Sequence, residues 1–313
     1  MNYIKDFQEN AQVEGIYLCK SKMIGVTKNG NDYMSAELAD KTGTFSAKIW
    51  DVNSAGIQDF GEGDYVEVSG QTKVFKGQMQ MKVDRLRVAS SDEYDISDYV
   101  PSSRFDINDM FKQVLALAES VENPYLRQLL KAFFVDDTDF VSKFTNISAA
   151  KSVHHAFCGG LLEHSLSVAT MCDSIAKHYD FLNRDLLITS ALLHDCGKTV
   201  ELSAFPKNDY TDEGNFLGHI VIGVEMINRK AEQIKDFPTG LRLQLDHCIV
   251  SHHHELEYGS PKKPALSEAM ALAYADDLDA KMETFREALE NVSTDEWLGF
   301  NRWIDSNIRR TDV

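Results

Sequence analysis

Residues 188–198 read ITSALLHDCGK and place a histidine beside an aspartate at the end of an apolar run. The run has the spacing of a helix that begins near Asp185, and Gly197 is a residue type that commonly follows a helix end. His194 and Asp195 are therefore predicted at the C-terminal end of a helix. Burying a carboxylate without a partner beside such a run is costly, so we expect Asp195 to meet a cation.

The other histidines surround this pair in the sequence. All ten histidines lie between residues 154 and 254. His164 falls on an earlier candidate helix, His219 begins a later one, and His252 and His253 end the next. Imidazole and carboxylate groups together suit divalent transition metals, and helical bundles often assemble such ligands from several helices. The clustering predicts a metal site in this half of the chain.

Helical periodicity begins at residue 105. Met110, Val114, Leu117 and Val121 recur at the spacing of one helix face. Further candidate helices cover residues 161–179, 185–195, 217–234, 242–254 and 267–289. We therefore predict an all-α bundle over residues 105–313.

The first part of the chain has a different pattern. Residues 13–89 contain short β-rich runs separated by turn signals such as Asp40-Lys41-Thr42-Gly43. Five or six short strands without a long helix predict a small closed barrel in residues 1–90. Residues 91–104 are polar and acidic and contain a proline, which is typical of a linker between domains.

Composition limits the class of protein. The chain has 313 residues, of which 43% are apolar and 26% charged, so it is long enough for two globular domains. An odd number of cysteines without a CxxC pair, and the absence of a leader or of an apolar run near 18 residues, predict a cytoplasmic protein that does not bind a membrane.

The net charge of −17 argues at first against a nucleic-acid partner. The charge is uneven, because residues 1–90 contain 11 basic and 12 acidic residues, whereas residues 152–313 contain 15 and 26. An acidic domain can still bind phosphates if bound cations supply positive charge.

The order of these residues resembles a known superfamily. His164, then His194 and Asp195, then Asp276 are similar to the signature of the HD superfamily of metal-dependent phosphohydrolases, and His219 with the later histidine pair resembles its binuclear members. Longer strings resemble the YhaM family of 3′-to-5′ exoribonucleases: GGLLEHS at 159–165, SHH at 251–253, EYGSP at 257–261 and ADDLDA at 275–280. The resemblance implies an N-terminal OB-fold barrel followed by an all-α HD domain.

The resemblance also implies a ligand set for two divalent metal ions. Manganese is the expected metal, with iron, cobalt or magnesium as alternatives. One ion would be held by His164, His194, Asp195 and Asp276, the other by His219, His252 and His253, with Asp195 as the bridge and Lys198 on the scissile phosphate. His254 stands where the family pattern has glycine, so His253 and His254 remain an alternative pair.

A role in binding single strands needs exposed aromatic rings and scattered cations. Tyr33, Lys73, Phe75 and Lys76 are the residues of the barrel that we predict to contact nucleic acid, whereas Trp50 is expected in the core. His154 and His155 lie in a polar turn before two glycines and are predicted near the substrate.

The resemblance implies a 3′-to-5′ exonuclease that acts on single-stranded RNA, with single-stranded DNA as a further substrate, and releases nucleoside 5′-monophosphates. Two alternatives stay open: a phosphohydrolase of free or cyclic nucleotides with a regulatory barrel, and a non-catalytic adaptor with a degenerate metal site. The oligomeric state is also open, a homo-oligomer included.

Overall fold

The computed structural model describes residues 2–27, 30, 32–75, 78–100, 102–151, 155–290, 292 and 296–311. The chain divides into two compact units, Met1–Pro101 and Ser102–Val313. Among the described residues, no helix is both long enough and apolar enough to cross a membrane.

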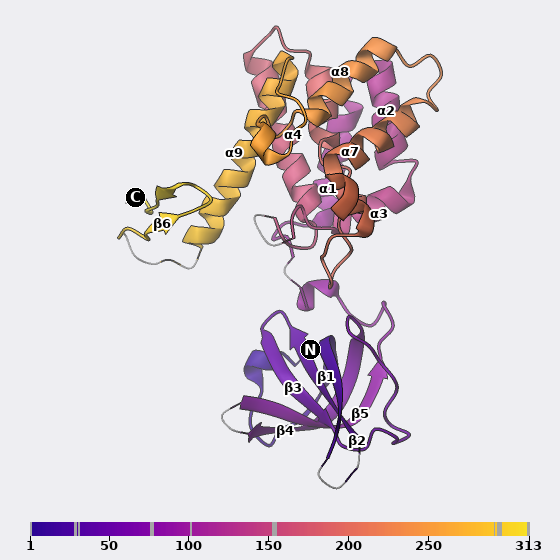
Figure 1. Cartoon of the computed structure of the whole chain (residues 1–313), viewed down its shortest axis with the longest axis vertical. Helices are drawn as coiled ribbons and strands as arrows, with labels where there is room; N and C mark the ends of the chain where they lie inside the picture. Colours follow the sequence, from indigo (N-terminus) through magenta and orange to yellow (C-terminus); the bar gives the residue numbers. More distant parts are fainter. Residues whose placement is uncertain are drawn as a thin grey trace. The chain divides into compact units, whose positions relative to one another are not determined.

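The first unit is the predicted closed barrel (Figure 1). Its strands are β1 (Gln12–Val26), β2 (Asp32–Asp40), β3 (Gly43–Ile49), β4 (Tyr65–Phe75) and β5 (Gln78–Val88), joined in the order β1-β2-β3-β5-β4. The β3–β5 pair is parallel and the other pairs are antiparallel.

Alternating side chains of these strands fill the barrel. Tyr17, Leu38, Phe45 and Met81 are buried in one apolar cluster. The pairing of β4 with β5 shifts at Gly70, where an added Cβ would lie 2.1 Å from the Lys82 carbonyl oxygen. A glycine is therefore required for the close approach of the two strands.

The segment after β5 packs on the barrel. The ring of Tyr94 stacks on Tyr65 with centroids 4.0 Å apart, and Tyr99 contacts both rings edge-on. The Lys41 amide donates to the Asp98 carbonyl oxygen within the short helix η2 (Ile96–Asp98). Much of the segment that we predicted as a linker, residues 91–104, is thus part of the first unit.

The second unit is mainly helical, as predicted. Its elements are α1 (Ile107–Glu119), α2 (Pro124–Phe134), α3 (Thr138–Asn146), α4 (Gly160–His178), α5 (Arg184–Leu193), α6 (Lys198–Glu201), α7 (Asp212–Ala231), α8 (Thr239–Val250), η3 (Leu256–Tyr258) and α9 (Ser267–Leu289). A short hairpin, β6 (Phe300–Asn301) and β7 (Ser306–Asn307), follows α9 (Figure 1).

Helix α5 is the centre of this unit. The Asn183 side chain caps its start by accepting from the Leu186 amide, and the whole stretch Leu186 to Leu193 is buried. The helix contacts α1, α2, α4, α8 and α9. Because α5 is surrounded in this way, its C-terminal end delivers the next residues, His194 and Asp195, to the interior of the bundle.

Candidate metal centre

Histidine and aspartate side chains from several helices meet at the end of α5. Helix α4 provides His164, α7 provides His219, α9 provides Asp276, and the turn after α8 provides His252 and His253. His194 and His252 are fully buried, and Asp195 is 1% exposed. The structure therefore brings together all seven side chains that we predicted as metal ligands.

Two features of the backbone position these residues. Helix α8 ends at Val250, earlier than the residue 254 that we predicted, so the turn that follows carries the histidine pair. Gly218 has φ 72° and ψ 157° inside α7, a conformation open essentially to glycine alone. The resulting kink precedes His219 directly and sets the direction in which its ring points.

The hydrogen bonds of the imidazoles fix their tautomers. His194, His252 and His253 each direct Nδ1 to a backbone carbonyl oxygen, those of Ala191, Ile249 and Tyr258, at 2.7–2.8 Å. A carbonyl oxygen only accepts, so Nδ1 carries the proton and Nε2 offers a lone pair. This is the arrangement that metal-binding histidines adopt.

Carboxylates perform the same task for the other two rings. His164 donates from Nδ1 to Asp279 Oδ2 at 2.7 Å, and His219 donates from Nδ1 to Glu201 Oε1 at 3.1 Å. Although burial opposes a charged imidazole, Asp276 and Asp279 raise the pKa of His164 to about 10. A cation bound at His164 Nε2 must therefore displace a proton.

The donor atoms fall into two groups. In the first, His164 Nε2 lies 3.2 Å from His194 Nε2 and 3.0 Å from Asp276 Oδ1. In the second, one donor atom from each of His219, His252 and His253 lies within 4.8 Å of the other two. Each group is close enough to share one ion.

Asp195 lies between the two groups. Its Oδ2 is 3.3 Å from His194 Nε2 and 3.6 Å from His164 Nε2, whereas its Oδ1 is 3.5 Å from His219 Nε2 and 3.7 Å from His252 Nε2. One oxygen of this carboxylate thus faces each group.

Three of these atoms are buried without a hydrogen-bond partner among the described residues: Asp195 Oδ1, His219 Nε2 and His252 Nε2. An unsatisfied buried polar atom costs about 1–3 kcal/mol. All three belong to the same small space and all three are electron-pair donors. The residues present therefore fit divalent transition-metal ions, which would satisfy all three at once.

Lys198 is held by the same carboxylate. Its Nζ lies 2.7 Å from Asp195 Oδ2. Burial opposes the charge on the amine, but Asp195 nevertheless raises the pKa of Lys198. Burial also opposes ionisation of Asp195, yet Lys198 and His194 hold the pKa of this carboxyl well below its usual range. Both groups are therefore charged at neutral pH.

A pocket of about 550 Å³ opens onto this centre. Its lining includes His164, Lys198, His252, His253 and Asp276. The alternative ligand His254 has φ 49°, and its ring packs edge-on against Tyr258 and stacks on Tyr274. The structure therefore gathers the pair His252 and His253 with His219.

Asp279 and Glu201 were not predicted from the sequence. Asp279 accepts from His164, from His155 Nε2 at 3.0 Å and from Ser167 Oγ, and Glu201 also accepts from the His219 amide at 2.9 Å. Asp279 follows Asp276 by three residues, and such spacing places two side chains on one helix face. That spacing is the signal that could have identified it.

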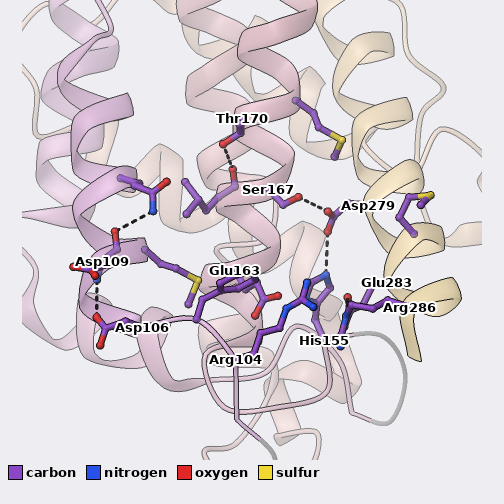
Figure 2. A pocket seen from close by; sticks show the side chains of 16 residues that line it. Arg104, Asp106, Asp109, His155, Glu163, Ser167, Thr170, Asp279, Glu283 and Arg286 are labelled. Carbon is purple, nitrogen blue, oxygen red and sulfur yellow. Dashed lines mark hydrogen bonds and ion pairs between the residues drawn. The ribbon is translucent and has the colours of Figure 1, made fainter. Parts of the chain in front are cut away.

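His155 occupies a second pocket, behind His164. Figure 2 shows Asp279 between Ser167 and His155, with Glu283 and Arg286 beside the imidazole. This pocket has a volume of about 740 Å³. His155 is only 3% exposed and supports Asp279, and its contact with substrate stays a prediction. His154 lies outside the described residues.

This second pocket contains another cluster of donors. One donor atom from each of His155, Glu163 and Glu283 lies within 4.8 Å of the other two, and His155 Nδ1 has no hydrogen-bond partner among the described residues. Arg286 already pairs with Glu283 through two nitrogens. Both oxygens of Glu283 are therefore already hydrogen-bonded to a guanidinium, whereas Asp195 Oδ1 has no hydrogen-bond partner among the described residues.

The barrel presents aromatic rings in two places. Phe75 is 52% exposed and Lys73 is exposed beside it, whereas Lys76 lies outside the described residues. Trp50, which we expected in the core, is 46% exposed and stacks on Tyr33 with centroids 5.3 Å apart. The prediction for Trp50 was wrong because Phe45, Ala47 and Ile49 are the inward residues of β3, so the next residue, Trp50, falls on the outward side of the alternation.

Two family models match the two parts of the chain. The HD domain family matches residues 161–281, and the tRNA_anti-codon family, an OB-fold nucleic acid binding domain, matches residues 17–89. The barrel is also similar to the second OB-fold domain of replication protein A from Methanococcus maripaludis, with 24% identity over 29% of this chain and 97% of that chain and a TM-score of 0.24.

A curated relative matches nearly the whole chain. It is the 3′-5′ exoribonuclease YhaM of Geobacillus sp. (strain WCH70), which is 34% identical over 295 residues, 94% of this chain and 90% of the relative. The match spans both units, and the two matching domain families occur in the order in which the barrel and the helical bundle occur in the structure. The chain therefore belongs to the YhaM family of 3′-5′ exoribonucleases, built from an N-terminal OB-fold and a C-terminal HD domain.

Proposed function

We propose that this protein removes nucleotides one at a time from the 3′ end of single-stranded RNA and releases nucleoside 5′-monophosphates in a metal-dependent reaction. The observation that carries the proposal is the position of Asp195, with one carboxylate oxygen facing each of two histidine groups. The relative named a 3′-5′ exoribonuclease supports RNA as the substrate and 3′ to 5′ as the polarity.

The proposed ligands follow the two groups. His164, His194, Asp195 and Asp276 would hold one ion, and His219, His252 and His253 would hold the other, with Asp195 shared. Imidazole mixed with carboxylate favours manganese, iron or cobalt, and manganese is our first choice, with magnesium as an alternative. Two divalent cations at such a site neutralise the phosphodiester and lower the pKa of water.

The protein's own groups orient this chemistry. Asp279 and Glu201 hold the His164 and His219 rings in the tautomer that turns Nε2 towards the centre. Lys198 lines the pocket and is charged because Asp195 lies 2.7 Å away. We propose that Lys198 also contacts the phosphate that is cleaved, as a point charge.

The barrel would bind the RNA on the 5′ side of the 3′ end that is cleaved. Phe75 and Lys73 lie together on the exposed end of β4, and Tyr33 stacks with Trp50 near the start of β2. Exposed rings with nearby cations bind single strands with little regard to base, so single-stranded DNA is a further substrate of this proposal. Lys76 belongs to the same predicted contact region.

The test uses three RNAs of one sequence with the full-length protein and Mn²⁺. A 5′-labelled strand should give a ladder of shortening products, a 3′-labelled strand should release labelled mononucleotide at once, and a circular strand should stay intact. Cleavage of the circle would identify an endonuclease. Turnover of cyclic or free nucleotides without shortening of RNA would favour the phosphohydrolase alternative.

A further inference from the structure

The hairpin after α9 carries exposed aromatic side chains. Asn301 Oδ1 accepts from the Trp303 amide at 2.9 Å and from the Ile304 amide at 3.2 Å, which fixes the turn between β6 and β7. Ile308 is buried and closes the base of the hairpin: its carbonyl oxygen accepts from the Leu298 amide, and its own amide donates to the Gly299 carbonyl oxygen. The turn therefore presents its side chains in a defined arrangement.

Two of these side chains reach the pocket over the metal centre. Arg302 and Trp303 line the same cavity of about 550 Å³ as His252, His253 and Asp276. His252 is fully buried, whereas Trp303 is 53% exposed. The pocket thus has proposed metal donors in its interior and an indole ring where it opens. Its volume is within the roughly 300–1,000 Å³ of sites that hold small molecules.

The indole is available for a planar ligand. The Arg302 guanidinium lies 4.6 Å from the Trp303 ring centroid, at cation–π distance. Of the residues that the structure describes, none places another aromatic ring on Trp303. A large aromatic surface left open beside a catalytic centre is the kind of surface on which nucleobases stack.

Arg302 points to the same ligand. It is exposed, and within the described ranges no carboxylate lies within 4.0 Å of its guanidinium. In an acidic domain, an arginine without such a partner at the opening of the pocket can pair with phosphate. An indole beside a guanidinium that has no carboxylate partner among the described residues matches a nucleobase and a phosphate of one strand.

We propose that Trp303 is the platform on which the 3′-terminal base of the substrate stacks, while Arg302 contacts a phosphate of the same strand. The inference rests on the proposed exonuclease function and adds the site that receives the terminal nucleotide. Every base has a π face, so the site accepts all four bases. An end that lacks a base is a poor substrate.

The experiment compares Trp303→Ala with the wild type on two RNAs, one with an ordinary 3′ nucleotide and one with a 3′-terminal abasic ribose. Stacking of one base on one ring predicts a loss of about 5- to 100-fold in kcat/KM for the wild type on the abasic end. Trp303→Ala should show the same loss on the ordinary RNA and no further loss on the abasic one. Trp303→Phe should recover most of the activity.

Two controls separate stacking from misfolding. Trp297→Ala removes a tryptophan that is 66% exposed near the same hairpin and does not line the pocket, so it should behave as the wild type. Hydrolysis of bis(p-nitrophenyl) phosphate reports on the metal centre without a base, and Trp303→Ala should keep it within about twofold of the wild type.

The outcomes that overturn the proposal are distinct. If Trp303→Ala still discriminates between the two RNAs as the wild type does, Trp303 is not the platform. If the variant also changes the oligomeric state in sedimentation, the hairpin is an interface between copies of the chain. If the wild type cleaves the small diester but shortens neither RNA, the exonuclease function fails together with the stacking site.

Discussion

Replacing Asp195 by asparagine removes the one carboxylate that faces both histidine groups. The amide keeps the size and shape of the side chain, so the variant changes charge and donor strength with little change in packing. The apolar residues of α5 that support this position, among them Leu187, Ile188 and Leu192, are fully buried and untouched by the change. We therefore expect Asp195→Asn to fold.

The magnitude follows from the distances. Loss of a partner that merely orients a ligand costs 10- to 100-fold in metal affinity, so loss of a shared donor should exceed 100-fold, or about 2.7 kcal/mol. The Nε2 atoms around Asp195 lie 3.3–3.7 Å from its oxygens. At such a separation one unit charge interacts with the carboxylate by about 5 kcal/mol at an effective dielectric constant near 20. We expect the Mn²⁺ Kd to rise between about 100- and several thousand-fold.

The assay measures bound manganese after gel filtration and the release of label from a 3′-labelled RNA. Asp195→Asn should retain less than one ion per chain and about 1% or less of wild-type activity. Asp180→Asn is the matched control, because this aspartate is exposed in the same domain and should behave as the wild type. Two retained ions, or activity above a few per cent, would show that Asp195 is not a donor shared by two cations.

Asp279→Ala removes the acceptor of His164 Nδ1 and should lower Mn²⁺ affinity about 10- to 100-fold. Raised Mn²⁺ should restore the activity of this variant, and Asp279→Asn should keep most of the activity. A loss of activity that added Mn²⁺ cannot reverse would contradict the positioning role of Asp279. Asp137 caps α3 and pairs with Lys230 at 2.7 Å, so Asp137→Ala should lower the free energy of unfolding by about 1–2 kcal/mol at pH 7. The hydrogen bond from Lys230 depresses the folded-state pKa of Asp137 below 3.8. The stability that the ionised Asp137 contributes is therefore present above pH 3.8 and should be lost as the pH falls further, which urea unfolding of the wild type and the variant would measure. If the difference in unfolding free energy between the two proteins did not depend on pH, the ion pair would be excluded. Phe75→Ala should weaken binding of long single-stranded RNA about 5- to 100-fold without altering hydrolysis of a small diester, and unchanged affinity would show that the helical domain binds RNA without this ring.

The two-domain architecture could be predicted because its signals are local. Alternating residues, turn signals and helical periodicity are all properties of short windows. The adjacent pair His194 and Asp195, next to an apolar run, was similarly informative. Its burial follows directly from the position of α5 in the centre of the bundle.

Other parts depend on contacts between distant residues. Asp279 and His155 are 124 residues apart, and nothing in a local window shows that they share a hydrogen bond. For the same reason we predicted only that His155 lies in a polar turn near the substrate, and not that its ring is buried against Asp279. The β6–β7 hairpin is held by strands of two residues each, too short for a periodic pattern.

The proposed function requires two cations, one on either side of Asp195. Crystals of the full-length protein soaked in Mn²⁺ and measured at the manganese absorption edge would test it most directly. We expect two anomalous peaks, one among His164, His194 and Asp276 and one among His219, His252 and His253, each next to a different oxygen of Asp195. A single peak, or a peak at the cluster of His155, Glu163 and Glu283 in place of these two, would contradict it.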